Sequence, residues 1–183
     1  MSKNARRLIN SVNIGNGANG VFAEHIPAGN FFTTRLKFNN VPVTVANVTG
    51  ASFGSVKIFD FVQGRVQIFG GSTRFTRISW AGEDIAATGS GDFSLGTTAT
   101  ADATLSTTDA NIQASTAMID PFVGGVGSGS GVFAAGAVYD GTATAIDIYL
   151  NVIIDDADVA DAASDVVLFT GEIEIVGAFY GDI

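Results

Sequence analysis

The chain has 183 residues and no cysteine, so it is long enough to bury a sizeable core and has no disulfide, thiolate nucleophile or cysteine-ligated metal site. Gly, Ala, Thr, Ser and Val are abundant while Lys and Glu are scarce, which favours strands and turns over exposed helices. The charge is split along the chain: up to Arg77 the balance is 9 − 2 = +7, and the remainder, without Lys or Arg, carries −16. This asymmetry predicts charged partners or self-complementary assembly, because net charge governs association rather than fold.

Residues 1–20 are predicted to form an N-terminal arm. They combine Lys3, Arg6 and Arg7 with a Gly/Asn-rich run, and they hold too few apolar side chains to order as an independent unit. Polar residues interrupt the basic start before an apolar run develops, so we expect no signal peptide, and no segment approaches the roughly 18 apolar residues of a membrane helix. The arm is expected to be loose or to lie on a neighbouring subunit, and residues 21–183 to form one β domain.

From Phe31 polar and apolar residues alternate, which predicts a half-buried strand with Arg35 and Lys37 on its wet face. The pattern continues over residues 41–48. The run 56–62 is largely apolar at both parities, which is typical of a central strand.

A hairpin is predicted at Gly70-Gly71, because two glycines can adopt the positive φ values of a tight turn between strands over 65–69 and 73–80. In the second strand, Arg74 and Arg77 each share a parity with large apolar residues. Neither face is purely core, a pattern that suits a contact between subunits.

Residues 81–130 are rich in small residues with isolated large ones, which indicates short strands and loops. Within them and just beyond, GGVGSGSG over residues 124–131 is typical of a flexible linker or a loop tip. The C-terminal part predicts a meander of antiparallel strands over 132–139, 142–154 and 166–180, with a turn at Asp140-Gly141. There is no βαβ rhythm, so we expect an all-β fold: an antiparallel β-sandwich or a jelly-roll-like domain with an extended N-terminal arm.

Catalytic and metal chemistry finds little support. His25 is the only histidine and has no nucleophile motif beside it, so we expect no enzyme and no cofactor. The acidic loop from Asp155 to Asp165 could offer oxygen ligands to Ca²⁺, but Asp161 stands where an EF-hand starting at Asp156 needs glycine. A solvated loop or a short capped helical turn explains it as well.

Two other binding functions, nucleic-acid binding and carbohydrate binding, have less support in the sequence. Nucleic acid is an unlikely partner, because the arm holds only three cations and the acidic remainder would repel phosphates. A carbohydrate-binding module, such as a receptor-binding head, would want clustered exposed aromatics, and Trp80, Tyr139, Tyr149 and Tyr180 are dispersed along the chain.

Three segments, Lys57 to Gly70, Gly91 to Thr116 and Tyr139 to Ala162, resemble in the same order a family of small phage virion proteins. The resemblance implies a structural component of the particle, an auxiliary capsid protein of the decoration or cement type. Such a protein would be made in the bacterial host cytoplasm, bind the major capsid protein at the virion surface and associate with itself, often as a homotrimer. A major shell or tail component is the alternative within the same particle. The resemblance transfers no catalytic residue. The residues expected at capsid or intersubunit contacts are the basic ones of the arm and early strands: Lys3, Arg6, Arg7, Arg35, Lys37, Arg74 and Arg77.

Overall fold

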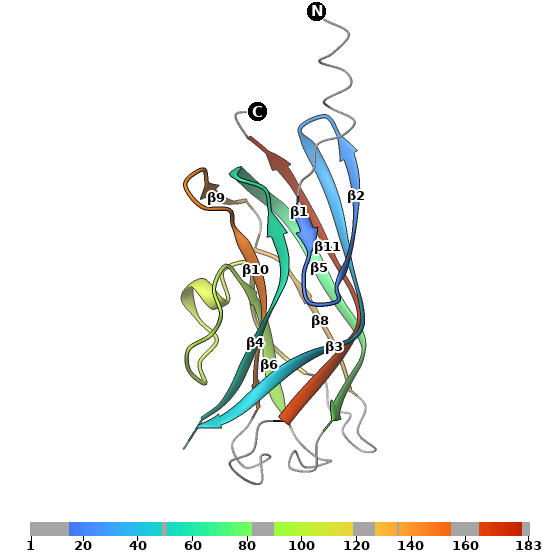
Figure 1. Ribbon diagram of the computed structural model, residues 1–183, viewed down its shortest axis with the longest axis vertical. Coiled ribbons are helices and arrows are strands. Elements are labelled where there is room, and N and C mark those ends of the chain that lie inside the picture. Colours follow the sequence, from blue (N-terminus) through green and yellow to red (C-terminus); the bar gives the residue numbers. More distant parts are fainter. Residues whose placement is uncertain are drawn as a thin grey trace, which may run out of the picture.

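The computed structural model describes residues 15–48, 51–81, 90–118, 127–134, 136–154 and 165–180 (Figure 1). These hold eleven strands and one short 3-10 helix. In chain order the elements are β1 (Gly15–Gly17), β2 (Phe22–Ala28), β3 (Phe31–Val48), β4 (Ala51–Phe61), β5 (Gly64–Ala81), β6 (Gly91–Gly96), η1 (Thr107–Asp109), β7 (Gln113–Ala117), β8 (Gly127–Val132), β9 (Ala137–Gly141), β10 (Asp147–Ile154) and β11 (Asp165–Phe179). The prediction of an all-β, antiparallel chain is confirmed. No helix among the described residues is long and apolar enough to cross a membrane.

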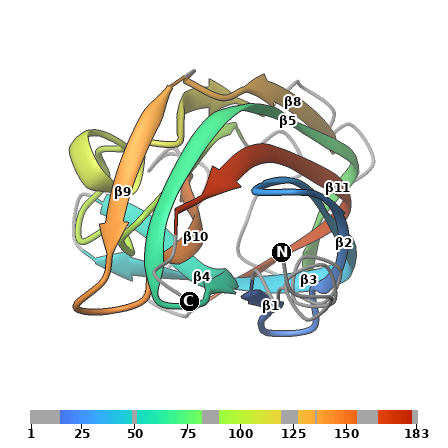
Figure 2. The same ribbon diagram turned by 90° about the horizontal axis from the view of Figure 1, so that it is seen from above.

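The described strands belong to one hydrogen-bonded antiparallel sheet. Its path runs β7-β6-β10-β4-β3-β11-β5-β8, and β1, β2 and β9 pair with β4, β3 and β5 respectively. The sheet curls strongly into a half-barrel, so that its strands surround a common axis in the view of Figure 2. The sequence predicted two packed sheets or a jelly roll. Alternation specifies only that each strand buries one face, and a curled sheet meets that requirement as well as two stacked sheets do.

Aromatic side chains fill the interior of the curl. The ring of Phe75 lies at the centre of this cluster, with ring centroids 5.3 Å from Phe38, 5.4 Å from Phe93 and 4.9 Å from Phe169, each pair edge-on. These rings come from β5, β3, β6 and β11, so strands far apart in the sequence share one hydrophobic core. Edge-to-face pairs of this kind contribute roughly 0.5–1.5 kcal/mol each beyond the burial of their area.

The long strands match the predictions from alternation. The expected strand from Phe31 is β3, and the apolar run 56–62 lies mostly in β4, which has partners on both edges: β10 on one side, and β3 and β1 on the other. The last two predicted strands are β10, from Asp147, and β11.

The predicted hairpin at Gly70-Gly71 is wrong, because β5 runs without a turn from Gly64 to Ala81. Gly71 serves close packing instead. A Cβ atom there would lie 2.2 Å from the carbonyl oxygen of Glu174 and 2.7 Å from the ring of Phe133. The glycine therefore admits the neighbouring strand and a ring, whereas the sequence pattern resembles a turn.

The C-terminal meander is also wrong. β9 pairs with β5, β10 lies between β4 and β6, and β11 lies between β3 and β5. The predicted linker over residues 124–131 contains β8, a strand paired with β5. Local turn signals did not determine these pairings; β11 has a fully buried inner face and two strands of 18 residues with which to pair.

The N-terminal part of the body begins earlier than predicted. Residues 15–20 were assigned to the arm, yet β1 pairs with β4, and residues 1–14 lie outside the described part of the chain. The His25 ring fixes β1 from the side: Nε2 lies 2.8 Å from the carbonyl oxygen of Gly15, and Nδ1 lies 2.9 Å from Oγ1 of Thr34. A carbonyl only accepts, so Nε2 carries the proton and, in the neutral ring, Nδ1 accepts from the Thr34 hydroxyl.

Candidate interaction surface

One side of the molecule carries alternating charges on four neighbouring strands. Glu24 on β2 lies opposite Arg35 on β3, which lies opposite Glu174 on β11. Two residues along, Lys37 on β3 lies opposite Glu172 on β11. The signs therefore form stripes that run along the strands: negative on β2, positive on β3, negative on β11 and positive on β5. We call this surface the striped face and define it by Phe22, Glu24, Arg35, Lys37, Glu172, Glu174 and Arg74.

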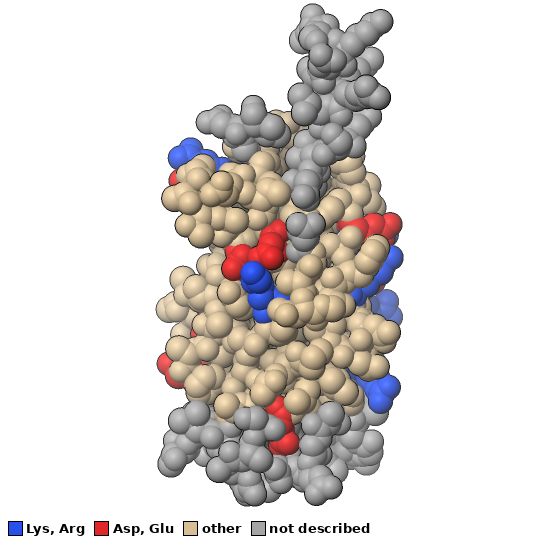
Figure 3. All heavy atoms as spheres, in the orientation of Figure 1, with Lys and Arg blue, Asp and Glu red and all other residues tan. Residues whose placement is uncertain are grey.

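Two ion pairs lie within the striped face. Nε of Arg35 lies 3.0 Å from a carboxylate oxygen of Glu174, and Nζ of Lys37 lies 2.9 Å from one of Glu24. The hydrogen bond from Lys37 and its charge lower the pKa of Glu24, and the hydrogen bond to Glu174 and the charge of that carboxylate raise the pKa of Arg35. The Lys37 ammonium also lies 5.9 Å from the ring centroid of Phe22. Figure 3 shows acidic and basic side chains side by side along the edge formed by these strands.

A bulge places both arginines of β5 on this surface. The pairing of β5 with β11 shifts register between Thr170 and Gly171, so Phe75 and Ile78 both point inward and are buried, although their parities differ. Arg74 and Arg77 are consequently both exposed. In the sequence, Arg74 and Arg77 each share a parity with large apolar residues, and the bulge explains this pattern. Neither arginine forms an ion pair with a described residue.

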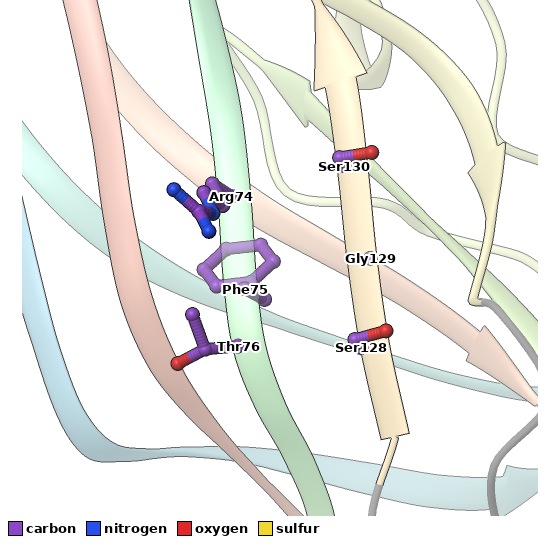
Figure 4. Close-up of a pocket in the computed structure, with 6 residues that line it drawn as sticks. All are labelled: Arg74, Phe75, Thr76, Ser128, Gly129 and Ser130. Atoms are coloured by element: carbon purple, nitrogen blue, oxygen red, sulfur yellow. The ribbon is translucent and has the colours of Figure 1, made fainter.

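The surface is hollowed on both sides of Arg74. One open depression of about 330 Å³ lies between β5 and β8 and is lined by Arg74, Phe75, Thr76, Ser128, Gly129 and Ser130 (Figure 4). A second, of about 450 Å³, lies toward β3 and is lined by Lys37, Arg74, Thr76, Gly171 and Glu172. Both are open to solvent and lined by hydroxyls, glycine backbone and charges. Such hollows accept side chains of another surface more readily than they enclose a small molecule.

Three large apolar side chains are exposed on β2 and β3 of the striped face: Phe22, Ile26 and Phe31. Among the described residues three others are exposed elsewhere, Val132 on β8, Val138 on β9 and Tyr180 just after β11, and β9 lies across the curl from β2 (Figure 2). Apolar side chains that lie among charges, as on β2 and β3, are typical of a protein interaction surface.

A second charged cluster was not predicted from the sequence. Nζ of Lys57 lies 2.8 Å from Asp60 and 3.7 Å from Asp147, and the Tyr149 hydroxyl donates to Asp147 over 3.4 Å. Burial favours a higher pKa for Asp60, but hydrogen bonds from Lys57 and Asp147 and the Lys57 charge outweigh it and leave that pKa lowered. Burial and the hydrogen bond to Asp60 raise the pKa of Asp147. The Lys57 ammonium already serves as the cation for both carboxylates. Among the described residues no group of three or more His, Cys, Asp or Glu could hold a metal ion.

The charge split of the sequence is partly satisfied within the chain. Three ion pairs join an early basic residue to a late acidic one: Arg35 to Glu174, Lys57 to Asp147 and Arg65 to Asp140. The topology brings these pairs together, because β11 inserts between β3 and β5 and the chain after β8 returns to β5 and β4. The asymmetry along the sequence is therefore not, by itself, evidence of an external partner.

The remaining predicted residues divide into two groups. Arg35, Lys37, Arg74 and Arg77 are brought together on one side, as the contact prediction requires, whereas Lys3, Arg6 and Arg7 lie outside the described residues. The acidic loop proposed for Ca²⁺ also lies outside them, except Asp165, which is buried at the start of β11.

The tyrosines considered for sugar binding do not gather. The Tyr139 hydroxyl donates to the carbonyl of Asn111, and burial raises its pKa to about 12. Tyr149 belongs to the Lys57 cluster, and exposed Tyr180 donates to Gln67. Each of the three is thus engaged with a different part of the body, and the side chain of Trp80 lies outside the described ones.

Comparisons with family models, with curated proteins and with solved structures found no match for the chain.

Proposed function

We propose that the chain is a non-enzymatic structural protein of a bacteriophage particle, a capsid decoration or cement protein that binds the head shell and stabilises it as an oligomer. The observation that carries the proposal is the striped face. Three exposed apolar side chains of β2 and β3, charges of both signs and open hollows occur together on this face of the described body. The three segments that resemble phage virion proteins give the class of assembly to which this surface would belong.

The proposal divides the work between two parts of the chain. The curled sheet supplies the rigid, filled β body that a sandwich or jelly roll would supply, and the striped face makes contacts between protein subunits. The basic arm, with Lys3, Arg6 and Arg7, contacts the major capsid protein at the virion surface. Individual exposed ion pairs contribute only about 0.2–1 kcal/mol, so apolar contacts and repeated binding across a symmetric shell must supply most of the affinity.

Reconstitution on shells assembled without this chain tests the proposal. Purified protein should saturate such shells and raise the temperature at which they open. Arg6→Glu combined with Arg7→Glu should lower occupancy without changing the unfolding of the isolated chain. Unaltered shells in the presence of excess protein would refute the decoration role, and the copy number per virion separates it from a tail or major shell component.

A further inference from the structure

We propose that the striped face binds a second copy of the chain across a two-fold axis that runs along the strands, midway between β3 and β11. The inference rests on the proposed function for its place in the particle, and it names the partner of that surface. Dimerisation is a property of the purified chain alone. The dimer can therefore be absent although the chain binds shells, and the chain can dimerise without binding shells.

The order of the stripes provides the symmetry argument. Across the sheet the signs are negative on β2, positive on β3, negative on β11 and positive on β5. This order is antisymmetric about the line between β3 and β11. A two-fold rotation about that line places β3 against β11 of the partner and β2 against the partner's β5. The stripes of β3 and β11 then meet with opposite signs, while Glu24 on β2 faces the row of the partner's Ser72 on β5, one row away from the partner's Arg74. Two sheets packed in this way have nearly aligned strands, as face-to-face sheets commonly do.

The rotation keeps the height along the strands, so it also pairs individual rows. Lys37 would meet the partner's Glu172, and Arg35 would meet the partner's Glu174. Glu172 and Arg74, neither of which forms an ion pair with a described residue, would both gain a contact. For Arg74 that contact is the ring of the partner's Phe22, which is 63% exposed in the single chain. Arginine stacked on an aromatic face is a common interface contact.

The next rows fit by size. Phe31, Ala178 and Gln67 form one row across β3, β11 and β5, and Ile26 lies in the row before it, which ends at Gly70. The same rotation sets Ile26 against the partner's Gly70, whereas Ala178, in the row of Phe31, is already buried within its own chain. No atom lies within 4 Å of the point where a Cβ of Gly70 would stand. The exposed side chain of Ile26 therefore faces a glycine with open space above it, which adds shape complementarity at this row.

The charge balance favours a second copy over another partner. Two chains of net charge −9 repel one another over most of their surfaces. The residues that define the striped face are three acidic and three basic, and the neighbouring Arg77 adds one positive charge, so two copies can meet there without the like-charge repulsion of their acidic surfaces. A shell surface of one sign would be matched by a patch of the other sign, not by alternating stripes. The contact is closed and two-fold, so it predicts a dimer instead of the trimer expected from the resemblance.

Two charge reversals and their mixture test the pairing by sedimentation velocity. In Lys37→Glu each dimer would oppose two pairs of carboxylates, and in Glu172→Lys two pairs of ammonium groups, so either variant alone should weaken the dimer by about 100-fold in Kd. Mixing the two variants should restore a dimer, because each reversed residue then meets its reversed counterpart. Ala101→Glu, on the exposed loop after β6, is the control that should leave the dimer unchanged.

The mixture separates intermolecular contact from folding. Lys37 and Glu172 are also neighbours within one chain, so circular dichroism must show that each variant is folded. The double variant, with both reversals in one chain, should dimerise with itself and provides a second measurement if a single variant folds poorly. A wild-type chain that sediments as a monomer or as a trimer, or a mixture that stays monomeric, would overturn the proposal. Shell binding by such a monomer would leave the decoration role intact, and a dimer that ignores shells would refute only that role.

Discussion

The two sides of the curled sheet use polar residues in opposite ways. On the striped face the polar side chains are exposed, and their ion pairs lie in solvent, with Arg35 and Glu174 46% and 39% exposed. On the side of β4, β10 and β6, which also carries the partly exposed Lys57 cluster, some polar side chains are buried in the body. Asn151 on β10 is fully buried, and so is Ser94 on β6. The polar groups of the striped face are thus available for contact with another molecule, whereas Asn151 and Ser94 contact other parts of the same chain.

Asn151 is the centre of the buried polar network. Its Oδ1 accepts from the Ser55 hydroxyl at 2.6 Å and from the Thr100 amide at 3.0 Å, and its Nδ2 donates to the carbonyls of Thr98 at 3.0 Å and Asp109 at 2.8 Å. Two accepted and two donated bonds fill the whole hydrogen-bonding capacity of an amide side chain. They fasten the loop between β6 and β7 to the sheet. A polar residue in a strand therefore stabilises the fold when its hydrogen-bond partners lie within the body, and is available for intermolecular contact when they do not.

The largest effect should distinguish an inward from an outward phenylalanine. Phe75→Ala should lower the free energy of unfolding by about 4 kcal/mol, because it removes the ring at the centre of the aromatic cluster and leaves a cavity. Phe22→Ala, on the striped face, should change it by less than about 0.5 kcal/mol. Urea unfolding of the two variants measures both. If dimerisation persists at the concentrations used, the Phe22 value must be taken at the lowest concentration. Equal losses would show that the striped face is part of the core.

The second effect concerns buried and exposed amides. Asn151→Ala should cost about 2 kcal/mol, because it removes four hydrogen bonds and takes from the Thr98 carbonyl and the Ser55 hydroxyl the partner that the amide provides, although Ser94 still donates to the Asp109 carbonyl. Asn39→Ala, an exposed amide on β3, is the matched control and should cost less than about 0.5 kcal/mol. Hydrogen exchange should show the loss first at the amides of the loop between β6 and β7. A variant as stable as the wild type would mean that the loop after β6 is held by other contacts.

Sequence predicts the strands on both sides but not their neighbours. The alternation of Arg35 and Lys37 with apolar residues locates β3 and its wet face correctly, since the period of two is a local property. The pairing of β11 with β3 and β5 joins residues 85 to 147 positions apart and is decided by burial, and no turn signal encodes it. The basic half of the striped face was therefore predictable, and its acidic stripe was not.

Bulges explain the remaining differences. Asn40 adopts a φ of 53°. The Thr170 hydroxyl accepts a hydrogen bond from the Asn40 amide and donates one to Oδ1 of Asn40. The alternation of buried and exposed residues in β3 therefore reverses after Phe38. The same kind of shift sets Arg74 and Arg77 on one surface. Both shifts correspond to one extra residue in a strand, which reverses the alternation of buried and exposed residues beyond it. The Asn151 network had no such signal, because its partners lie in loops.

A third, smaller effect should appear in the pH dependence of the Lys57 cluster. The pKa of Asp60 is lowered in the folded chain, so its contribution is present above the ordinary value of 3.8 and is lost as pH falls through the lowered one. The pKa of Asp147 is raised, so its ionisation opposes folding once pH rises above 3.8. Asp60→Asn should therefore destabilise at pH 7 and Asp147→Asn should not, each by less than about 1 kcal/mol because the groups are partly exposed.

Thermal unfolding of these two variants between acidic and neutral pH measures the difference. The stabilities of Asp60→Asn and the wild type should converge as the solution is acidified, since Asp60 is then protonated in both states of the wild type. Asp147→Asn should instead gain on the wild type as pH rises. The opposite order at neutral pH would show that Lys57 pairs mainly with Asp147.

The smallest effect should come from the ion pair of Arg35 and Glu174. A double-mutant cycle with Arg35→Gln and Glu174→Gln should give a coupling of about 0.2–1 kcal/mol in the isolated chain, because solvent screens both groups. The coupling should vanish at high salt, since the screening length falls to about 3 Å at 1 M. Measured on dimerisation instead of unfolding, the same substitutions should have a larger effect, because each removes contacts that the partner's residues make in a less hydrated interface. Equal effects on unfolding and on dimerisation would show that this pair acts within one chain, and the distinction between a structural side and an interactive side would then fail at its clearest residues.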